Sequence, residues 1–298
     1  MRRRARLALI AGLVLALGPA GRANQSDIAG LVGSYLWTSP NSRFGGFSAI
    51  EVEPDGIGFV ALSDKGAVVK GRFLRAPDGS IRGIDADPLV VLRGRIDGAL
   101  TPARSDSEGL AIAKDGTIYV SFEIAPRVLR YQRLNGRAVY LPIPREFSRM
   151  ATNGALEALA ISEDGTLYTM PEVSIRRDGN IAVFRFRDGK WDQPFNIPSI
   201  GSFLPVGADF GPDGKLYLLE RQFRGLGGFA GRVRRFEVGG TSIGPGEVIL
   251  EIPGGLYGNL EGLAVWRDAL GSLRLTMISD DNFYPFLATR IVEFRVRD

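Results

Sequence analysis

One short pattern recurs along this chain of 298 residues: an apolar run, a turn, a second apolar run and then a carboxylate. The five copies occupy residues 45–64, 106–123, 155–172, 205–221 and 259–281. In four copies the turn contains Asp-Gly, with the aspartates at Asp55, Asp115, Asp164 and Asp213. Asp-Gly between apolar runs is a strong hairpin signal, because glycine tolerates the positive φ that such turns need. Hairpins repeated roughly every 50 residues predict the blades of a β-propeller.

We therefore expect an all-β fold, a single β-propeller with five recognisable blades of four antiparallel strands and the repeated hairpins innermost. A sixth, degenerate blade stays open because the first unit is long. Residues 31–37 and 289–296 read as strands outside the copies. We expect them to come together in the last blade, since closing the ring removes a sheet edge. One domain over residues 24–298 accommodates the whole array.

Residues 1–23 have the pattern of an export signal. Four arginines among residues 2–6 precede an apolar stretch over residues 7–17, and small residues follow. We expect a signal peptide cleaved after Ala20 or Ala23, an extracytoplasmic location (periplasmic or secreted) and no membrane span in the mature protein. An uncleaved N-terminal anchor is the alternative.

Removal of this segment would also remove the basic character of the chain. Without its five arginines the 37 basic residues fall to 32, against 33 acidic residues, which leaves a net charge of −1. The charge therefore gives no reason to invoke nucleic acid as a partner. We expect a monomer that binds a small-molecule substrate or ligand in the central funnel.

The chain contains no cysteine and no histidine. It can therefore form no disulfide, no thiolate nucleophile and no Ser-His-Asp triad, and it lacks the usual imidazole and thiolate ligands of zinc. Acid–base chemistry must come from carboxylates, Tyr, Lys or metal-bound water. A metal, if bound, should be hard and oxygen-ligated, and calcium is the leading choice for an exported protein.

The carboxylates of the copies are expected to converge. In an antiparallel hairpin the start of the first strand and the end of the second lie together, opposite the turn. Copies one and four depart from the pattern, with Ser48 and Val206 where the others have an early acid. The acids expected at one end of the central channel are Asp64, Glu108, Glu123, Glu157, Glu172, Glu220, Glu261 and Asp280. So many like charges require cations or hydrogen-bond donors to offset their repulsion.

This arrangement supplies the candidate functional residues. The candidate catalytic residues are Glu108, Glu157 and Arg221. The candidate substrate-binding residues are Arg127, Arg221 and Glu220, since a guanidinium fork suits phosphate or carboxylate. The candidate calcium ligands are Glu108, Glu123, Glu157, Glu261, Asp280 and Asp281. Structural alternatives stay open: the early acids can accept backbone N–H bonds between blades, the later acids can pair with nearby arginines, and Asp281 can cap a turn.

The same stretches resemble a known family. Residues 44–64, 107–123, 153–168, 216–221 and 259–283 look like the phytase-like proteins, labelled "esterase-like activity of phytase". The resemblance covers nearly all of the chain beyond the signal segment. It implies an exported propeller with a hydrolase role on phosphate or carboxylic esters, and no settled set of catalytic residues. Two alternatives stay open: a non-enzymatic cell-envelope binding or scaffold propeller, and a lactonase-like propeller enzyme.

Overall fold

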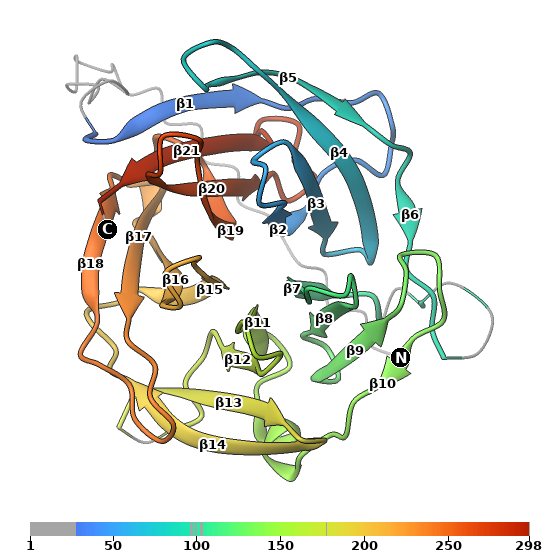
Figure 1. The fold of residues 1–298 in the computed structure, drawn as a ribbon. Helices are drawn as coiled ribbons and strands as arrows, with labels where there is room; N and C mark the ends of the chain where they lie inside the picture. The colour runs from blue at the N-terminus through green and yellow to red at the C-terminus, as the bar shows by residue number, and fades with distance from the viewer. Residues whose placement is uncertain (1–27, 96–97, 99, 102–103, 177, 298) are drawn as a thin grey trace, which may run out of the picture.

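The computed structural model describes residues 28–298 except 96–97, 99, 102–103, 177 and 298. The expected signal peptide, residues 1–23, lies outside the described residues. The described chain forms five antiparallel sheets set around one axis, as Figure 1 shows. This is a five-bladed β-propeller, so the expected fold class is confirmed, and the described residues contain no sixth blade.

The blades follow one another along the chain. Blade one contains β2 (Phe47–Val52), β3 (Gly58–Ser63), β4 (Ala67–Arg75), β5 (Ile81–Ala86) and the short β6 (Val90–Val91), which pairs with β4. Blade two contains β7 (Ser107–Ile112), β8 (Ile118–Phe122), β9 (Arg127–Tyr131) and β10 (Val139–Tyr140). Blade three contains β11 (Leu156–Ile161), β12 (Leu167–Pro171), β13 (Ile181–Arg187) and β14 (Lys190–Ile197).

Blade four contains β15 (Leu204–Phe210), β16 (Leu216–Phe223), β17 (Phe229–Phe236) and β18 (Glu247–Ile252). Blade five contains β19 (Asn259–Arg267), β20 (Leu273–Asp280), β21 (Arg290–Val296) and, from the other end of the chain, β1 (Leu31–Leu36). The pairing of β1 with β21 is the closure that the sequence predicts, with Ser34 opposite Val292. The described chain includes two short 3-10 turns, Arg145–Arg149 and Gly225–Gly227.

The hydrophobic core lies between blades rather than within one centre. One cluster joins Leu62 of blade one to Val120 of blade two, and another joins Tyr217 of blade four to Leu275 of blade five. Each remaining junction has a cluster of its own. Every blade is therefore stabilised by its two neighbours, as the flat faces of adjacent sheets bury each other's apolar side chains. Among the described residues no helix has the length and apolar character needed to cross a membrane.

The aspartates of the Asp-Gly turns have a structural role. Asp115 Oδ1 accepts the N–H of Thr117 at 2.9 Å, and Asp164 Oδ1 accepts the N–H of Thr166 at 3.1 Å. The glycine that follows Asp115 has φ +81°, a conformation that L side chains rarely adopt. These turns lie at the end of each hairpin opposite the acids.

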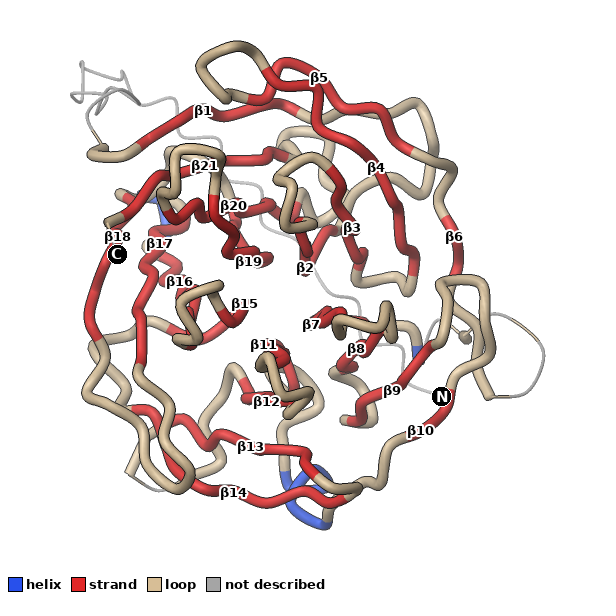
Figure 2. The backbone as a smooth tube through the Cα atoms, viewed as in Figure 1, coloured by secondary structure: helices blue, strands red, loops and turns tan. Residues whose placement is uncertain are grey.

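The innermost strands of the five blades are β2, β7, β11, β15 and β19, and each contacts the next around the channel (Figure 2). Neighbouring innermost strands lie so close together that some positions have no room for a side chain. A Cβ on Gly262 of β19 would lie 2.8 Å from Cα of Ala49 and from N of Ile50, both on β2 of the neighbouring blade. The ring can close at this radius because the residue there has no side chain.

We expect Gly262→Ala to lower the free energy of unfolding by about 1–3 kcal/mol, because the added methyl must push two backbones apart. Urea unfolding measures the change. Gly240→Ala is the control, since a Cβ at this exposed position would meet nothing within 4 Å. Equal effects of the two substitutions would contradict the close-approach argument.

Candidate functional site

Each innermost strand has a register shift at the same place, close to its start. The shifts fall after Phe47, Ser107, Leu156, Pro205 and Leu260. Such a β-bulge adds a residue to one strand and re-aims its side chain, and bulges are frequent beside active sites. The bulged positions carry Ser48, Glu108, Glu157, Val206 and Glu261, which are the early positions of the sequence pattern. A narrow central cavity is lined by four of them, Ser48, Glu108, Glu157 and Val206.

The later position of the pattern is fixed by strand pairing. Asp280 pairs with Asn259, which stands two residues before the bulged Glu261. In the same way Arg221 pairs with Leu204, two residues before the bulged Val206. The same main-chain pairing joins Glu123 to Asp106, whose carbonyl accepts the N–H of Glu123 at 3.0 Å. The five equivalent residues are therefore Asp64, Glu123, Glu172, Arg221 and Asp280. Blade four presents a cation, Arg221, where the other blades present an acid.

The prediction that Glu220 faces the channel is wrong. Successive residues of a strand point to opposite faces, so Glu220 points away from the side on which Arg221 lies. Its carboxylate is fully buried within blade four, where it accepts from Arg232 Nε at 2.7 Å and from Arg234 Nε and Nη2 at 2.9 and 2.6 Å. Glu220 is a structural counter-charge for two arginines of β17.

Arg127 also lies apart from the acids. Its side chain is 2% exposed and donates to the carbonyl oxygens of Ile124 and Ala125 at 3.1 and 2.9 Å. The guanidinium carbon lies 4.1 Å from the centre of the Phe122 ring. The geometry gives Arg127 a role in holding the loops of blade two and leaves it no free fork for a substrate anion.

Asp281 fulfils the turn-capping alternative. Its Oδ1 accepts the N–H groups of Gly46 and Phe283 at 2.9 and 3.0 Å, and its Oδ2 accepts from the hydroxyl of Thr289 at 3.0 Å. Both oxygens are thus used by protein donors, which leaves Asp281 a poor calcium ligand. The contact with Gly46 joins blade five to blade one.

The remaining acids form one buried, mutually repelling group. Burial, followed by the charges of Glu261, Asp106, Glu123 and Asp64, raises the pKa of Glu108 well above its ordinary value. The pKa of Glu157 is also raised well above its ordinary value, by burial and then by the charges of Glu108, Glu172, Glu123 and Glu261. Burial is also the main cause that raises the pKa of Glu261 to about 8, of Asp64 to about 7 and of Asp280 to about 6. The acids of four blades therefore meet at one end of the channel.

Arg221 neutralises one side of this group. Its Nη2 donates to Glu172 Oε1 of blade three at 2.9 Å, and its Nη1 donates to Glu261 of blade five and to Asn259 Oδ1 at 2.7 Å. Asn259 in turn donates to Glu261 Oε1 at 2.7 Å. The guanidinium therefore bridges the two blades that flank its own. The hydrogen bonds of Arg221 end on Glu172, Glu261 and Asn259, while its charge also acts on Glu157 and the charge of Lys65 partly offsets Asp64 and Asp106.

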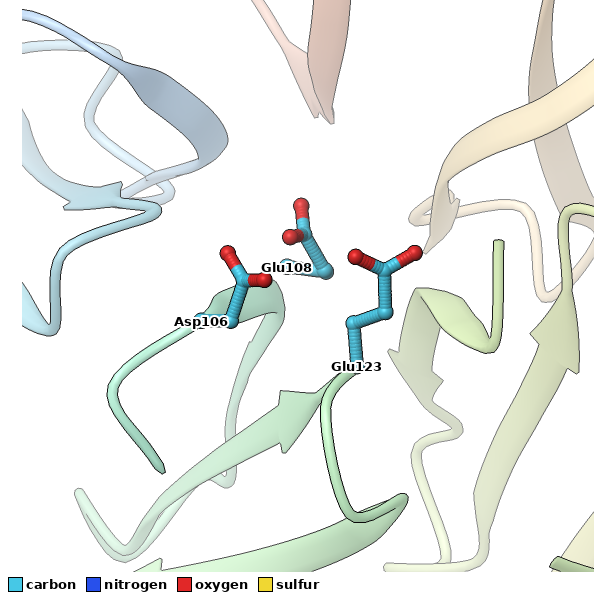
Figure 3. Close-up of side chains that lie close together, drawn as sticks. All are labelled: Asp106, Glu108 and Glu123. Atoms are coloured by element: carbon cyan, nitrogen blue, oxygen red, sulfur yellow. The ribbon is translucent and has the colours of Figure 1, made fainter. Parts of the chain in front are cut away.

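The opposite side has the geometry of a metal site. In Asp106, Glu108 and Glu123 one carboxylate oxygen each lies within 4.8 Å of the others. Figure 3 shows the three carboxylates pointing toward a common space. Burial, followed by the charge of Glu123, raises the pKa of Asp106 to about 6. Three carboxylates from one blade are a suitable donor set for a hard divalent cation such as calcium.

Two members of the site were not among the residues predicted from the sequence. Asp106 and Asn259 each stand two residues before the bulged glutamate, in the stretches Asp-Ser-Glu-Gly-Leu and Asn-Leu-Glu-Gly-Leu. A polar residue at this position in copies two and five is the sequence signal that could have identified them. The meaning of this signal depends on the bulge, which re-aims the glutamate toward the side chain two residues earlier.

The fold and these residues define a β-propeller with an acidic site at one end of its channel. The sequence assigns it further, because residues 42–283 match the phytase-like family, described as esterase-like activity of phytase, and the chain belongs to this family. A comparison with curated protein sequences gives no significant match.

Solved structures of similar shape share little sequence with the chain. A gluconolactonase from Xanthomonas campestris is 19% identical with a TM-score of 0.43, and the match covers 80% of this chain and 68% of the other. Regucalcin, a calcium-binding protein from Agrobacterium tumefaciens, is 14% identical with a TM-score of 0.44, over 85% of this chain and 78% of the other. A protein of unknown function from Dyadobacter fermentans is 11% identical with a TM-score of 0.45, over 91% and 100%.

In the absence of calcium, stability should fall as the pH rises from about 5 to about 8. The acids of the site bind protons more tightly in the folded than in the unfolded protein, so their contribution is full below their ordinary pKa values. It is lost as the pH passes the raised values of about 6 for Asp106 and about 8 for Glu261. We expect a loss of at least about 1.4 kcal/mol, the equivalent of one pKa unit in one group. Urea unfolding in the presence of a chelator measures it, and a flat or rising profile would contradict the repulsion.

Glu220→Gln separates the structural acid from the acids of the site. Removing the charge leaves Arg232 and Arg234 buried without a full counter-charge, which should cost about 3–5 kcal/mol of stability. Calcium should raise the melting temperature of this variant as much as that of the parent protein. A reduced response to calcium at unchanged fold would place Glu220 in the site.

Proposed function

We propose that this protein is a calcium-dependent hydrolase of phosphate or carboxylic esters, with its reaction centre among the acids at the channel end. The single observation that carries the proposal is the Asp106, Glu108 and Glu123 cluster, with oxygens within 4.8 Å of one another. Membership of the phytase-like family supports the ester substrate class.

The electrostatics of the site favour a bound cation, in addition to its geometry. Arg221 offsets Glu172 and Glu261, yet the charges of the neighbouring acids still raise the pKa of Glu108 and Glu157. A divalent ion held by Asp106, Glu108 and Glu123 would remove the repulsion on this side. When bound, calcium would polarise the carbonyl or phosphoryl oxygen of the ester as a Lewis acid.

Glu157 is the residue we assign to proton transfer. It lies on blade three, beside the ligand cluster of blade two, and burial together with the charge of Glu108 raises its pKa, which makes its carboxylate a stronger base than an ordinary one. Water adds to the acyl carbon or to phosphorus while Glu157 takes its proton. The ester C–O or P–O bond then breaks, and the proton passes to the leaving oxygen. Glu157 also belongs to the group whose charge the cation must offset, so its basicity depends on cation occupancy.

Arg221 has a positioning role in this proposal. Its donors are taken by Glu172, Glu261 and Asn259, so it holds these side chains rather than a substrate anion. By neutralising that side it confines the cation to the blade-two cluster. This differs from the direct anion contact that its residue type suggests.

A second function, binding without reaction, is favoured by the fact that the candidate arginines are already bound to protein acceptors. With both Arg221 and Arg127 occupied by protein acceptors, no arginine among the candidate residues is free to stabilise a transition-state oxyanion. A cell-envelope propeller that binds a cation-dependent ligand without reaction would have the same site. The N-terminal sequence supports an extracytoplasmic location for either function, where calcium is abundant.

Glu123→Gln should weaken calcium binding at least tenfold, because a charged ligand becomes neutral while the shape of the side chain is kept. The midpoint of the calcium-induced rise in melting temperature measures the affinity. Asp115→Asn is the control, since Asp115 is fully exposed at the far end of the same hairpin.

Activity distinguishes the two functions. Calcium-dependent release of 4-nitrophenol from its acetate or phosphate ester, or opening of a simple lactone, that Glu157→Gln abolishes supports the hydrolase. Calcium binding with no turnover of any of these substrates would leave the binding function.

A further inference from the structure

Apolar side chains that the fold leaves in solvent occur at the same end of the propeller as the acids. Phe223, the last residue of β16, and Leu226, in the loop between β16 and β17, are 66% and 110% exposed. Tyr284 and Phe286, between β20 and β21, are 55% and 78% exposed. Both loops begin where the second strand of a blade ends, which is the acid end of each hairpin. Exposed apolar side chains gathered beside a site mark a binding surface.

The loop of blade four is held in a fixed position. A Cβ on Gly228 would lie 2.9 Å from Cα of Gly255, so the loop rests on the connection that leads into β19. The N–H of Gly255 donates to the carbonyl of Phe229 at 3.1 Å. The ring of Phe229 lies 5.0 Å from that of Phe223 and 5.7 Å from the guanidinium carbon of Arg221. A chain of contacts therefore leads from the site to the exposed Phe223.

The loop of blade five is held as firmly and carries backbone strain. Asn282 and Phe283 have φ of +49° and +53°, values that are rare for residues with a side chain and concentrate at functional sites. A Cβ on Gly46 would meet both the Phe283 ring and Oδ1 of Asp64, so ring and carboxylate border one small space. Beyond Phe283, the rings of Tyr284 and Phe286 stack with centroids 5.3 Å apart.

The two loops lie on either side of the acids of blade five. Phe229 is next to Arg221, which binds Glu261, and Phe283 is next to Asp64, whose pKa is raised by burial and then by the charge of Asp280. The exposed apolar side chains of both loops therefore lie on the end of the propeller at which a ligand would reach the acids. A molecule that complements both parts has a polar head and an apolar tail.

We propose that the ester bound by this site carries a large apolar acyl or alkyl group, which lies against Phe223, Leu226, Tyr284 and Phe286. The inference rests on the proposed function, and names its substrate class. Each methylene removed from water on these side chains improves binding by roughly threefold to fourfold. These four side chains would thereby favour the binding of long-chain esters over short ones.

The test compares catalytic efficiency on 4-nitrophenyl octanoate and on 4-nitrophenyl acetate, with calcium and without lipid. We expect a preference for the octanoate of at least tenfold, which falls at least fivefold in the double variant Leu226→Ser, Phe286→Ser. Leu270→Ser is the matched control, because Leu270 is 80% exposed on the β19–β20 turn at the opposite end. Equal preference in the parent protein and the double variant, at equal melting temperature, would overturn the proposal.

Failure of the proposed function gives a different result. If neither ester is hydrolysed, calcium-dependent binding of octyl phosphate and of inorganic phosphate is compared by calorimetry. Octyl phosphate bound more tightly than phosphate, with the advantage reduced in the double variant, supports the apolar surface even so. Equal affinities overturn it.

A lipid surface is the competing occupant of the exposed side chains. Binding of the parent protein to phosphatidylcholine vesicles that the double variant loses, with the ratio of the two esters unchanged, would assign these side chains to a membrane and overturn the proposal.

Discussion

The closeness of the five innermost strands is the constraint on which the rest of the structure depends. Where β19 meets β2, Gly262 lies so near the backbone of Ala49 that a methyl group does not fit. The equivalent residue after each bulge is small: Ala49, Gly109, Ala158, Gly207 and Gly262. The residue directly before this small residue is the extra residue of the β-bulge in each strand, and the bulge changes the direction of its side chain. The same packing that closes the ring thus brings three glutamates toward the axis.

Like charges brought so near must be offset, and the protein does so unequally. Blade four has no early acid, since Val206 is at its bulge, and it supplies Arg221 at the later position. One repeat therefore provides a cation for the acids of its two neighbours. The asymmetry leaves the blade-two side under repulsion. A propeller built from five identical repeats would have no such preferred position for a cation.

The sequence was sufficient for the architecture because local rules decide it. Asp-Gly turns and paired apolar runs define the hairpins, and terminal strands that need a partner define the closure. It also predicted that most of the acids come together, because all hairpins place their acids at the end opposite the turn. It failed at Glu220, since a shift of one residue in a strand exchanges the two faces, and an acid followed by an arginine gives no sign of which one faces the axis. Asp106 and Asn259 depend on the bulge, and a bulge leaves little trace in a single sequence. The sequence also suggested that Arg127 was available to a substrate. Its partners are main-chain carbonyl groups, and every residue has such a group, so the sequence gives no sign of which ones a side chain will meet.

The contact of Asp281 with Gly46 has a consequence for when the site comes into existence. This contact joins the last blade to the first, with Asp64 and Asp280 at the same seam, and the β1–β21 pairing completes the last blade. In chain order β21 follows all the other strands, so during synthesis β1 and blade one must wait without their partners until blade five has been made. The two ends of the chain then meet in a single long-range step, whose cost is the closure of a loop of almost the entire chain. The complete acid group, which includes Asp64 and Asp280, therefore comes together only when the ring has closed.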